Sequence, residues 1–591
     1  NNQSNPLLAP TFQNKRNDIE NLNAALYLKI TLPLGFSIQT TYSPRFEWTN
    51  YLFHKAAASP DSGSQNGRVE RTHTKDFYWQ WDNMLKWNKT FGKHAFDFTF
   101  LANWEKFQRW HDEMTNENFL PTDELGYGGI GFGTSPNVSS DDVYRTGDAF
   151  MGRLHYVYDQ RYLITATVRR DGYSAFGLAN PRATFPAIAL GWVFSEEKFL
   201  HRPDWFEYGK LRLSWGKNGN RAVGTYAAFM QLAPRKYIYV DPATGSLVTA
   251  NTFYASTMAN PNLKWESTTS WNIGTDLTFL KGRLSANLDV YKKITTDLLV
   301  SRELPSLIGY SSVMSNIGEV QNTGVELSLN STNIRMDKLT WRTSFSLAYN
   351  KNKITHLYGI MEDVKDADGN VIGQREADDI KNKRFIGHDI DEIWDYKVVG
   401  IWQEEEREEA AKYGQQPGDV HLLDKDMNYK YDNTDKEFQG TTMPRLRWSM
   451  RNDFTLFKNF NISFNMYSYI GHKKTLGRFT NDNALLNVTN QIKRDYWTPE
   501  NRNNEYPRLA NKKPAGVSYA IYKNASFLRF DNISIGYTFP KKLIEPLRIQ
   551  NLNVNATMKN AGYISGWPGY DPENSDANTP RVIYFGINLT L

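Results

Sequence analysis

The chain of 591 residues contains no cysteine, which excludes disulfides, thiolate catalysis and zinc–thiolate sites within it. No uninterrupted apolar run is long enough to cross a bilayer as a helix, and the mean hydropathy of −0.60 argues against a bundle of membrane helices. The 69 basic and 64 acidic residues nearly balance. Because no basic run is interleaved with aromatics, we expect no nucleic-acid partner.

Recognisable catalytic motifs are also missing. The 10 histidines are scattered without a His-x-x-x-His pair, and there is no Gly-x-Ser-x-Gly elbow and no phosphate-binding loop. Carboxylate pairs for glycoside hydrolysis meet only in space, so a motif search does not exclude them. We expect a protein that is not an enzyme and that requires no cofactor.

What the chain does have is alternation with a period of two residues, together with 14% aromatic residues. In the stretch 263–293, two long alternating arms flank a turn at 281–282. In the second arm Leu284, Ala286, Leu288 and Val290 face one way, and Ser285, Asn287 and Asp289 face the other. Similar stretches recur along the chain and predict about sixteen or seventeen strands of about ten residues, the length that a tilted strand needs to cross a bilayer.

The expected connections alternate in length. Tight turns are predicted at 92–93, 160–161, 281–282, 336–337 and 458–459, and long connections over 108–146, 217–262, 351–444 and 472–525. Short turns at one end and long loops at the other are typical of an outer-membrane barrel. We therefore predict an all-β fold, a transmembrane antiparallel β-barrel over residues 1–591, with short periplasmic turns and long extracellular loops that include 351–444.

Several segments resemble the SusC/RagA-type TonB-dependent transporters of Bacteroidetes outer membranes. The resemblance rests on seven segments that follow one another in the family's order. They are RRDGYSAFG (169–177), FPAIALGWVFSEEKF (185–199), LRLSWGKNGN (211–220), NPNLKWESTTSWNIGTDL (260–277), NIGEVQNTGVELSL (316–329), FLRFDNISIGYTFP (527–540) and GYDPENS (569–575).

This resemblance implies a barrel of 22 strands whose first strands, plug and TonB-contacting segment are not recognisable in this sequence. It implies TonB-dependent import of oligosaccharides or peptides, with a SusD-like surface lipoprotein as a lid, and a dimer of such pairs as the assembly. The alternative from another class is a passive porin or a surface-binding barrel without energy coupling. A soluble adhesin built of several sheets is a third reading of the same alternation.

The last strand carries the expected assembly signal. The segment RVIYFGINLTL places Phe585, Ile587, Leu589 and Leu591 on one face. In this class, an alternating terminal strand is the usual signal for the barrel-assembly machinery, although its commonest last residue is Phe. An ordinary closing strand explains the same pattern.

One acidic loop is a candidate calcium site. The segment DKDMNYKYDNTD has the spacing of an EF-hand loop, but Tyr429 stands where the sharp turn needs Gly, and Asp replaces the terminal Glu. A solvated acidic turn is the alternative. The candidate ligands are Asp424, Asp426, Asn428, Asp432 and Asp435.

Aromatic residues in the predicted loops are candidate ligand-binding residues, because aromatic faces stack on sugar rings. The candidates are Trp110, Tyr226, Tyr237, Tyr239 and Tyr254. Trp110 fits an interfacial aromatic girdle equally well. Trp265 is expected near a lipid headgroup boundary, because it lies just beyond the loop that carries Asn260-Pro261-Asn262.

Overall fold

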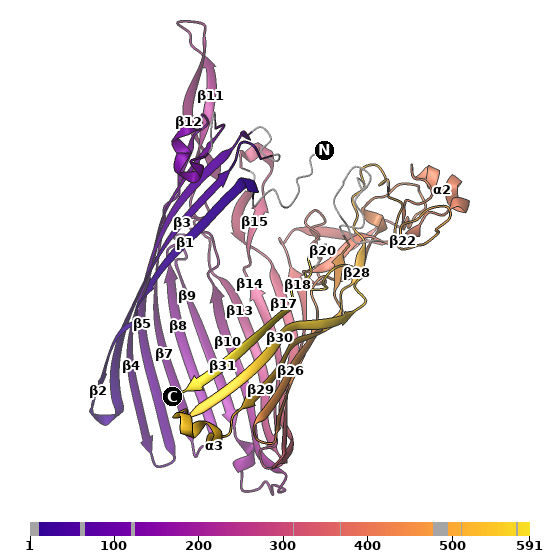
Figure 1. Ribbon diagram of the computed structural model, residues 1–591. Helices are drawn as coiled ribbons and strands as arrows, with labels where there is room; N and C mark the ends of the chain where they lie inside the picture. Colours follow the sequence, from indigo (N-terminus) through magenta and orange to yellow (C-terminus); the bar gives the residue numbers. More distant parts are fainter. Residues whose placement is uncertain are drawn as a thin grey trace. The chain divides into compact units, whose positions relative to one another are not determined.

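A computed structural model describes residues 11–59, 65–119, 124–310, 312–366, 368–476, 495–509, 511–574 and 577–591. Most of their regular structure is β-strand (Figure 1). Among these residues no helix has both the length and the apolar character needed to cross a membrane.

Nineteen of the described strands belong to one antiparallel sheet. They are β1 (Gln13–Asn23), β2 (Leu26–Thr31), β3 (Phe36–Lys55), β4 (Arg68–Phe91), β5 (His94–Glu117), β6 (Asn137–Ser140), β7 (Val143–Tyr158), β8 (Tyr162–Tyr173), β9 (Arg182–Trp192), β10 (Phe206–Asn220), β13 (Glu266–Phe279), β14 (Leu284–Thr296), β17 (Glu319–Met336), β18 (Leu339–His356), β25 (Leu446–Leu456), β26 (Phe460–Ile470), β29 (Phe527–Thr538), β30 (Asn551–Ser565) and β31 (Val582–Thr590).

At two positions in the order of strands across this sheet, two shorter strands take the place of one long strand. We call each position in this order a row. β1 and β2 both pair with β3, and β6 and β7 both pair with β5. If each interrupted row is counted once, the nineteen strands make seventeen rows in the described residues. The all-β class and the number of strands predicted from alternation are therefore confirmed.

The tight turns have the backbone that short hairpins require. Leu280 and Lys281 both have positive φ, 58° and 57°, and Gly282 follows at 74°. Gly92 lies between β4 and β5 with a φ of 57°. Consecutive positive φ values match the right-handed twist of the flanking strands, which explains why these connections stay short. The five predicted tight turns are all present.

The strands are longer than predicted at the ends that face the long connections. The expected connection 108–146 begins only after Glu117, because β5 continues through Trp110. Inside the connection 217–262 lies a separate hairpin of β11 (Gln231–Val240) and β12 (Leu247–Thr257). Charged residues interrupt the alternation there, although strands that extend into solvent accept charge, and so the pattern does not reveal where these strands end.

The long connections of the later part carry their own short elements. They are β15 (Leu299–Glu303), β16 (Ser312–Asn316), β19 (Met361–Lys365), β20 (Val371–Glu376), β21 (Glu392–Tyr396), β22 (Val398–Ile401), α2 (Arg407–Lys412), β23 (Val420–Leu422), β24 (Lys436–Thr441), β27 (Lys473–Thr475), β28 (Tyr522–Asn524) and α3 (Lys541–Ile544). The predicted loop 351–444 thus begins inside β18 and folds into several small sheets.

The chain divides into two compact units. The first comprises Asn1–Gly191, Ser214–Trp271 and Ile294–Glu319, and the second comprises Trp192–Leu213, Asn272–Lys293 and Val320–Leu591.

In the first unit the two faces of the strands differ sharply. One face of β4 and β5 carries Trp81, Phe100 and Trp104, which are exposed by 44%, 41% and 37%. The opposite face carries Asp82 and Asn103, which are paired in register. We call these the apolar face and the polar face. An exposed apolar face opposite a polar one is the arrangement of a membrane-spanning strand.

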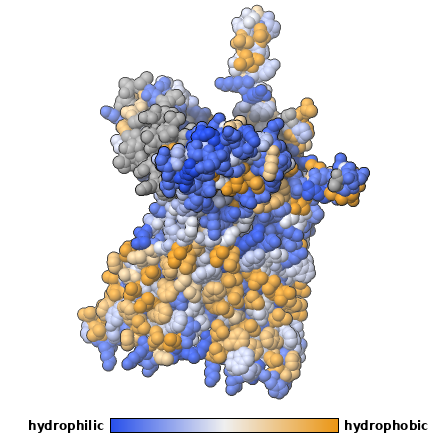
Figure 2. Space-filling model, turned by 90° about the vertical axis from the view of Figure 1, so that its right-hand side faces the viewer, coloured by the Kyte–Doolittle hydropathy of each residue, from blue (hydrophilic) through white to orange (hydrophobic). Residues whose placement is uncertain are grey.

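The second unit shows the same contrast. In β29 the exposed Ile533 and Ile535 alternate with Asn532 and Ser534. In the predicted hairpin, Asp276 and Asp289 both pair with Arg212 of β10, whereas Leu288 and Val290 are exposed. Figure 2 shows hydrophobic residues gathered in a band across the strands on the face that it views, with hydrophilic residues on both sides of the band.

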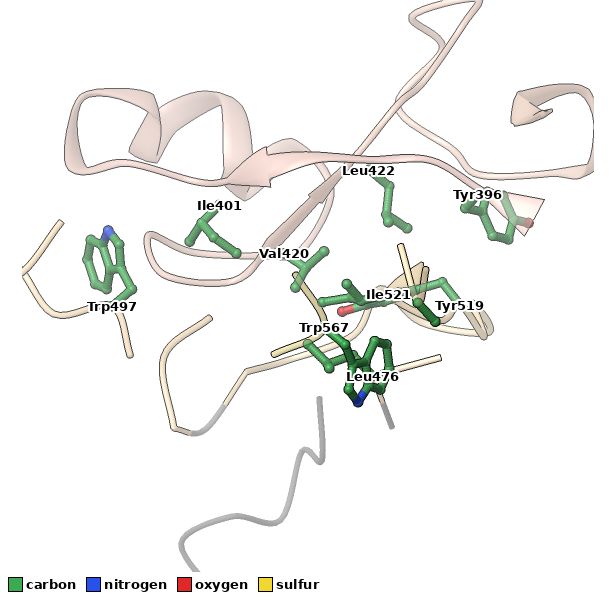
Figure 3. Close-up of a cluster of buried hydrophobic side chains, with 10 residues drawn as sticks. Tyr396, Ile401, Val420, Leu422, Leu476, Trp497, Tyr519, Ile521 and Trp567 are labelled. Atoms are coloured by element: carbon green, nitrogen blue, oxygen red, sulfur yellow. The ribbon is translucent and has the colours of Figure 1, made fainter. Parts of the chain in front are cut away.

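The connections of the second unit enclose their own hydrophobic core (Figure 3). Its buried members are Tyr396, Ile401, Val420, Leu422, Leu476, Trp497, Tyr519, Ile521, Ala525 and Trp567. They come from three separate connections, so these loops form one packed structure rather than independent solvated tails.

The first unit has a smaller core at the end of the strands. Its members are Tyr173, Ala175, Phe176, Phe185, Val223, Ala228, Leu263 and Trp265. Trp265 is only 5% exposed and stacks on Phe176 with ring centroids 4.8 Å apart. The expectation that Trp265 lies at a headgroup boundary is therefore wrong, because the segments around Phe176 and Leu263 fold over it.

Candidate ligand-binding cavity

A cavity of about 710 Å³ lies within the first unit. The polar faces of β4, β5, β8 and β10 supply most of its wall, and Trp265 and Phe185 add an apolar part. Its polar lining includes Tyr78, Gln80, Asp82, Asn103, Glu105, Arg169, Asp171, Lys217, Asn218 and Arg221. Its volume is in the range of cavities that hold small ligands.

A chain of hydrogen bonds fixes the β4 side of the cavity. The Tyr78 hydroxyl donates to Gln80 Oε1 at 2.9 Å, and Gln80 Nε2 donates to Asp82 Oδ2 at 2.8 Å. Asn103 Nδ2 donates to Asp82 Oδ1 at 2.7 Å from β5. Two amides therefore hold the Asp82 carboxylate, which keeps spare acceptor capacity for a ligand.

An ion pair between Glu105 and Arg221 crosses the cavity wall. The Arg221 guanidinium also lies over the Tyr173 ring, 5.0 Å from its centroid. Gly147 makes room for the carboxylate, because a Cβ there would lie 2.7 Å from Glu105 Oε1. The Arg221 side chain is 49% exposed and Glu105 only 14%, so the guanidinium is the partner that reaches water and is available to a ligand.

Among the described residues, the remaining charged groups of the lining form two closed pairs, Arg169 with Asp171 and Asp148 with Arg182, and leave one free cation. Arg169 Nε donates to both carboxylate oxygens of Asp171, at 2.9 Å each, on the polar face of β8. In the part of the chain that the structure describes, Lys217 forms no ion pair. Its ammonium is a donor for a carboxylate, hydroxyl or carbonyl oxygen of a ligand.

The apolar part of the wall contains one buried donor. The indole N–H of Trp265 is buried and has no hydrogen-bond partner among the described residues. A buried donor without a partner costs free energy that a ligand or a water molecule relieves. Together, the amides, three cations, four carboxylates (Asp148 included) and aromatic rings suit a polar ligand.

The predicted ligand-binding aromatics lie elsewhere. Trp110 is a residue of β5, in register with Lys75, and belongs to the apolar face rather than to a loop. Tyr237, Tyr239 and Tyr254 are exposed on one face of the β11–β12 hairpin. None of them lines the cavity described above, so their role in ligand binding remains a prediction.

Tyr226 is the fifth aromatic candidate. It adopts a positive φ of 67°, and its hydroxyl accepts a hydrogen bond from the Tyr144 backbone N–H at 2.9 Å. The hydroxyl thus closes the start of β7 and is already engaged within the fold.

Sequence reasoning missed the residues that do line the cavity. Asp82, Glu105 and Lys217 lie in long strands, where a polar residue at alternate positions is expected and carries no distinguishing signal. Arg221 directly follows β10. All four can be recognised as lining residues of a cavity only because the fold brings them together.

Three of the predicted calcium ligands come together. One ligand oxygen from each of Asp424, Asp426 and Asp435 lies within 4.8 Å of the others, and Asp435 is fully buried. Asp432 instead accepts a hydrogen bond from the Thr434 backbone N–H and begins a short 3-10 turn. The side-chain oxygen of Asn428 accepts from the Lys430 backbone N–H.

The backbone supports this arrangement. Tyr429 adopts the left-handed conformation with a φ of 63°, where the sequence pattern lacked a glycine, and donates its N–H to Asp424 Oδ2 at 2.9 Å. Partial burial opposes ionisation of Asp424, but hydrogen bonds from Tyr413 and Tyr429 hold its pKa below the usual value. Desolvation and the neighbouring Asp424 carboxylate raise the pKa of Asp426. Three oxygens this close fit a hard cation such as Ca²⁺.

The predicted assembly-signal residues lie at the end of the chain. Phe585, Ile587 and Leu589 belong to β31 and follow one another on the same face, and Leu591 follows the strand. Phe585 pairs in register with Ala556 of β30. All four side chains are exposed. Whether they direct assembly remains a prediction.

The sequence of this chain is similar to those of known proteins. A family model described as "TonB dependent receptor-like, beta-barrel" matches residues 1–561. The TonB-dependent receptor SusC of Bacteroides thetaiotaomicron is 32% identical over 467 residues, which cover 75% of this chain and 43% of SusC. TonB-dependent receptor P3 of Formosa agariphila is 28% identical over 562 residues, 93% of this chain and 53% of the relative. The chain thus spans about half the length of the curated relatives that it matches.

Solved structures agree with this family at the level of the fold. The RagAB peptide transporter superposes with a TM-score of 0.81 at 20% sequence identity, over 99% of this chain and 63% of the other. The RagAB peptide importer in its "open-open" state gives a TM-score of 0.79 at 20% identity, over 99% and 62%. At this identity the likeness establishes the β-barrel type of fold and nothing about the ligand.

Proposed function

Because the chain belongs to the TonB-dependent receptor-like β-barrel family and is of the SusC/RagA type, we propose that it forms the wall of an outer-membrane importer. The cargo is an oligosaccharide or a peptide, and the energy comes through TonB. The observation that supports import most directly is the polar cavity on one face of strands whose other face is exposed and apolar. A nutrient passes along the polar face, and lipid covers the apolar face.

The cavity chemistry defines what such a cargo must offer. The carboxylates of Asp82 and Glu105 accept from hydroxyls, amides or ammonium groups, whereas Lys217 and Arg221 donate to carbonyl or carboxylate oxygens. Trp265 adds an apolar surface. Both a peptide with charged termini and an oligosaccharide rich in hydroxyls meet this description, and the relatives are described as SusC and as parts of a peptide transporter.

The partners belong to the same proposal. We expect a SusD-like lipoprotein lid, the TonB complex, the barrel-assembly machinery and outer-membrane lipid as partners, with two transporter–lipoprotein pairs as a dimer. The test is purification of the full-length protein from native membranes in mild detergent, followed by mass spectrometry. A co-purifying surface lipoprotein supports the lidded importer, and repeated purification without one contradicts it.

Uptake measurements test the transport itself. Cells that lack the full-length gene are complemented with wild type, with Glu105→Gln plus Arg221→Gln, or with Arg153→Gln, and depletion of oligosaccharide and peptide mixtures is followed. Arg153 is the matched control, because it lies on β7 but does not line the cavity. We expect uptake in wild type and the control, reduced uptake in the double variant, and loss of uptake when the proton-motive force is collapsed. Uptake that survives this collapse would instead identify a passive porin.

A further inference from the structure

The apolar face of the first unit carries two lysines among its aromatic residues. Lys75 of β4 is in register with Trp110 of β5, and Lys106 of β5 is in register with Trp79 of β4. All four alternate in phase with Trp81 and Trp104, so they lie on the apolar face and not in the cavity.

Each lysine rests on an aromatic ring. Lys75 Nζ lies 5.0 Å from the centroid of the Trp110 ring, and Lys106 Nζ lies 4.9 Å from the centroid of the Tyr144 ring. Such contacts orient an ammonium group without neutralising it. Among the described residues, neither lysine forms an ion pair with a carboxylate.

Their height along the strand places the lysines at one edge of the hydrocarbon layer. Phe96, near the tight turn, packs on Trp87 and marks the opposite edge. Ten residue steps along β5 separate Phe96 from Lys106. At about 3.3 Å per step and a tilt of roughly 40°, they span about 25 Å of height, which is the height of a barrel's apolar band.

Lys75 lies higher. It is opposite Trp110, fourteen steps from Phe96, which corresponds to about 35 Å of height. The hydrocarbon core is about 30 Å thick and the whole bilayer about 40–45 Å, so this level lies among the headgroups. The two cations therefore face the layer in which lipid phosphates are found.

We propose that Lys75 and Lys106 form a binding site for the phosphate of an anionic outer-leaflet lipid. Charge complementarity supports this occupant, since each ammonium lacks an anionic partner within the described residues and points where an anionic headgroup would lie. Trp110 and Tyr144 orient the ammonium groups, and their rings suit the headgroup level, where Trp and Tyr concentrate. The site rests on the apolar face being covered by lipid, as the proposed function also requires.

Native mass spectrometry of the full-length protein in detergent tests this site. Monophosphorylated lipid A and the same lipid after enzymatic dephosphorylation are titrated against wild type and Lys75→Gln plus Lys106→Gln. The control is Lys89→Gln, because Lys89 lies over the Phe91 ring on the same face but at the tight-turn end. Heat-modifiable migration in gels reports separately that each barrel is folded, and uptake assays report separately on import.

We expect wild type and Lys89→Gln to bind the phosphorylated lipid more tightly than the dephosphorylated one. The double variant should bind the phosphorylated lipid about 25-fold more weakly, at roughly fivefold per lysine, and lose the preference. Should the double variant fail to fold, each single variant should show the fivefold loss, and Lys→Arg should retain binding. Equal affinity of wild type for both lipids, or an equal loss in Lys89→Gln, would overturn the site.

Discussion

A buried ion pair in the second unit gives a sharp quantitative prediction. Arg529 of β29 and Asp571 have side chains that are each 2% exposed, and Arg529 Nη2 lies 2.5 Å from Asp571 Oδ1. Asp571 also accepts hydrogen bonds from the Glu573 backbone N–H at 2.8 Å and the Thr579 hydroxyl at 2.6 Å. This carboxylate therefore anchors the connection between β30 and β31 to β29.

The perturbation is Asp571→Asn, which leaves the Arg529 guanidinium buried with one anionic partner fewer. Breaking a buried pair on one side costs about 3–5 kcal/mol. Glu573, whose Oε2 lies 2.6 Å from Arg529 Nε, remains as a partner and holds the cost toward the lower end of this range. Since about 1.36 kcal/mol is a factor of ten, local opening should become easier by two to four powers of ten. Hydrogen exchange of a peptide covering 566–574, measured by mass spectrometry in detergent micelles, reads this directly.

Two companion variants make the measurement decisive. Asp453→Asn removes an exposed pair, because Arg451 and Asp453 are 55% and 41% exposed, and it should cost no more than about 1 kcal/mol. Arg529→Met combined with Asp571→Asn should recover much of the loss, since no buried guanidinium remains and the Glu573 carboxylate, which is 30% exposed, is reached by water. If Asp571→Asn behaves like Asp453→Asn, the inference from burial is refuted.

Three further predictions concern the connections. A chelator should lower the melting temperature of the loops in wild type, because bound calcium stabilises the folded loops. It should not lower the melting temperature of the Asp424→Ala plus Asp426→Ala variant. A wild type whose melting temperature does not respond to chelator would contradict the calcium site. Burial lowers the pKa of His421, whose ring lies 3.5 Å from that of Trp402, so folding favours neutral His421. The contribution of His421 to loop stability should therefore be complete above pH about 6.5 and decline below it. Hydrogen-exchange protection of residues 420–422, corrected for intrinsic rates, should fall between pH 7.5 and 5.5 in wild type but not in His421→Gln. Constant protection in wild type would count against this prediction. Trp265→Ala should destabilise the core of the first unit by about 3–5 kcal/mol, with faster exchange over 173–180 and a milder effect for Trp265→Phe; unchanged exchange would show that this core is not cooperative.

Alternation in the sequence was enough to predict the strands and tight turns. Side chains in a strand point to alternate faces, so Leu288 and Val290 could be separated from Asp289 without any knowledge of the sheet. The same rule could not find where strands end in solvent, because Trp110 and its charged neighbours fit a loop and a solvated strand equally well.

The family segments could be recognised before their purpose was visible. Gly177 of one segment lies so close to Pro261 of another that a Cβ would be 2.1 Å from the Pro261 carbonyl oxygen. The Gly177 N–H donates to the Leu263 carbonyl at 3.0 Å. This contact covers Trp265, and it joins residues more than eighty positions apart, which local patterns do not reveal.

The cavity was the least predictable part. Glu105 and Arg221 are 116 positions apart and meet only because the sheet brings β5 and the end of β10 together within the first unit. The acidic loop was more accessible to sequence reasoning, since its ligands are close in the chain. Even so, Asp432 has a capping role that spacing alone did not distinguish from ligation.

The central claim is that the polar face of the strands borders water and the apolar face borders lipid. Because the chain has no cysteine, single substitutions can test it in intact outer membranes with a membrane-impermeant maleimide. Gln80→Cys and Arg153→Cys on the polar face should be labelled, whereas Trp81→Cys and Phe100→Cys on the apolar face should react only with a lipid-soluble reagent. Equal labelling of both sets by the water-soluble reagent, or the reverse pattern, would contradict the account.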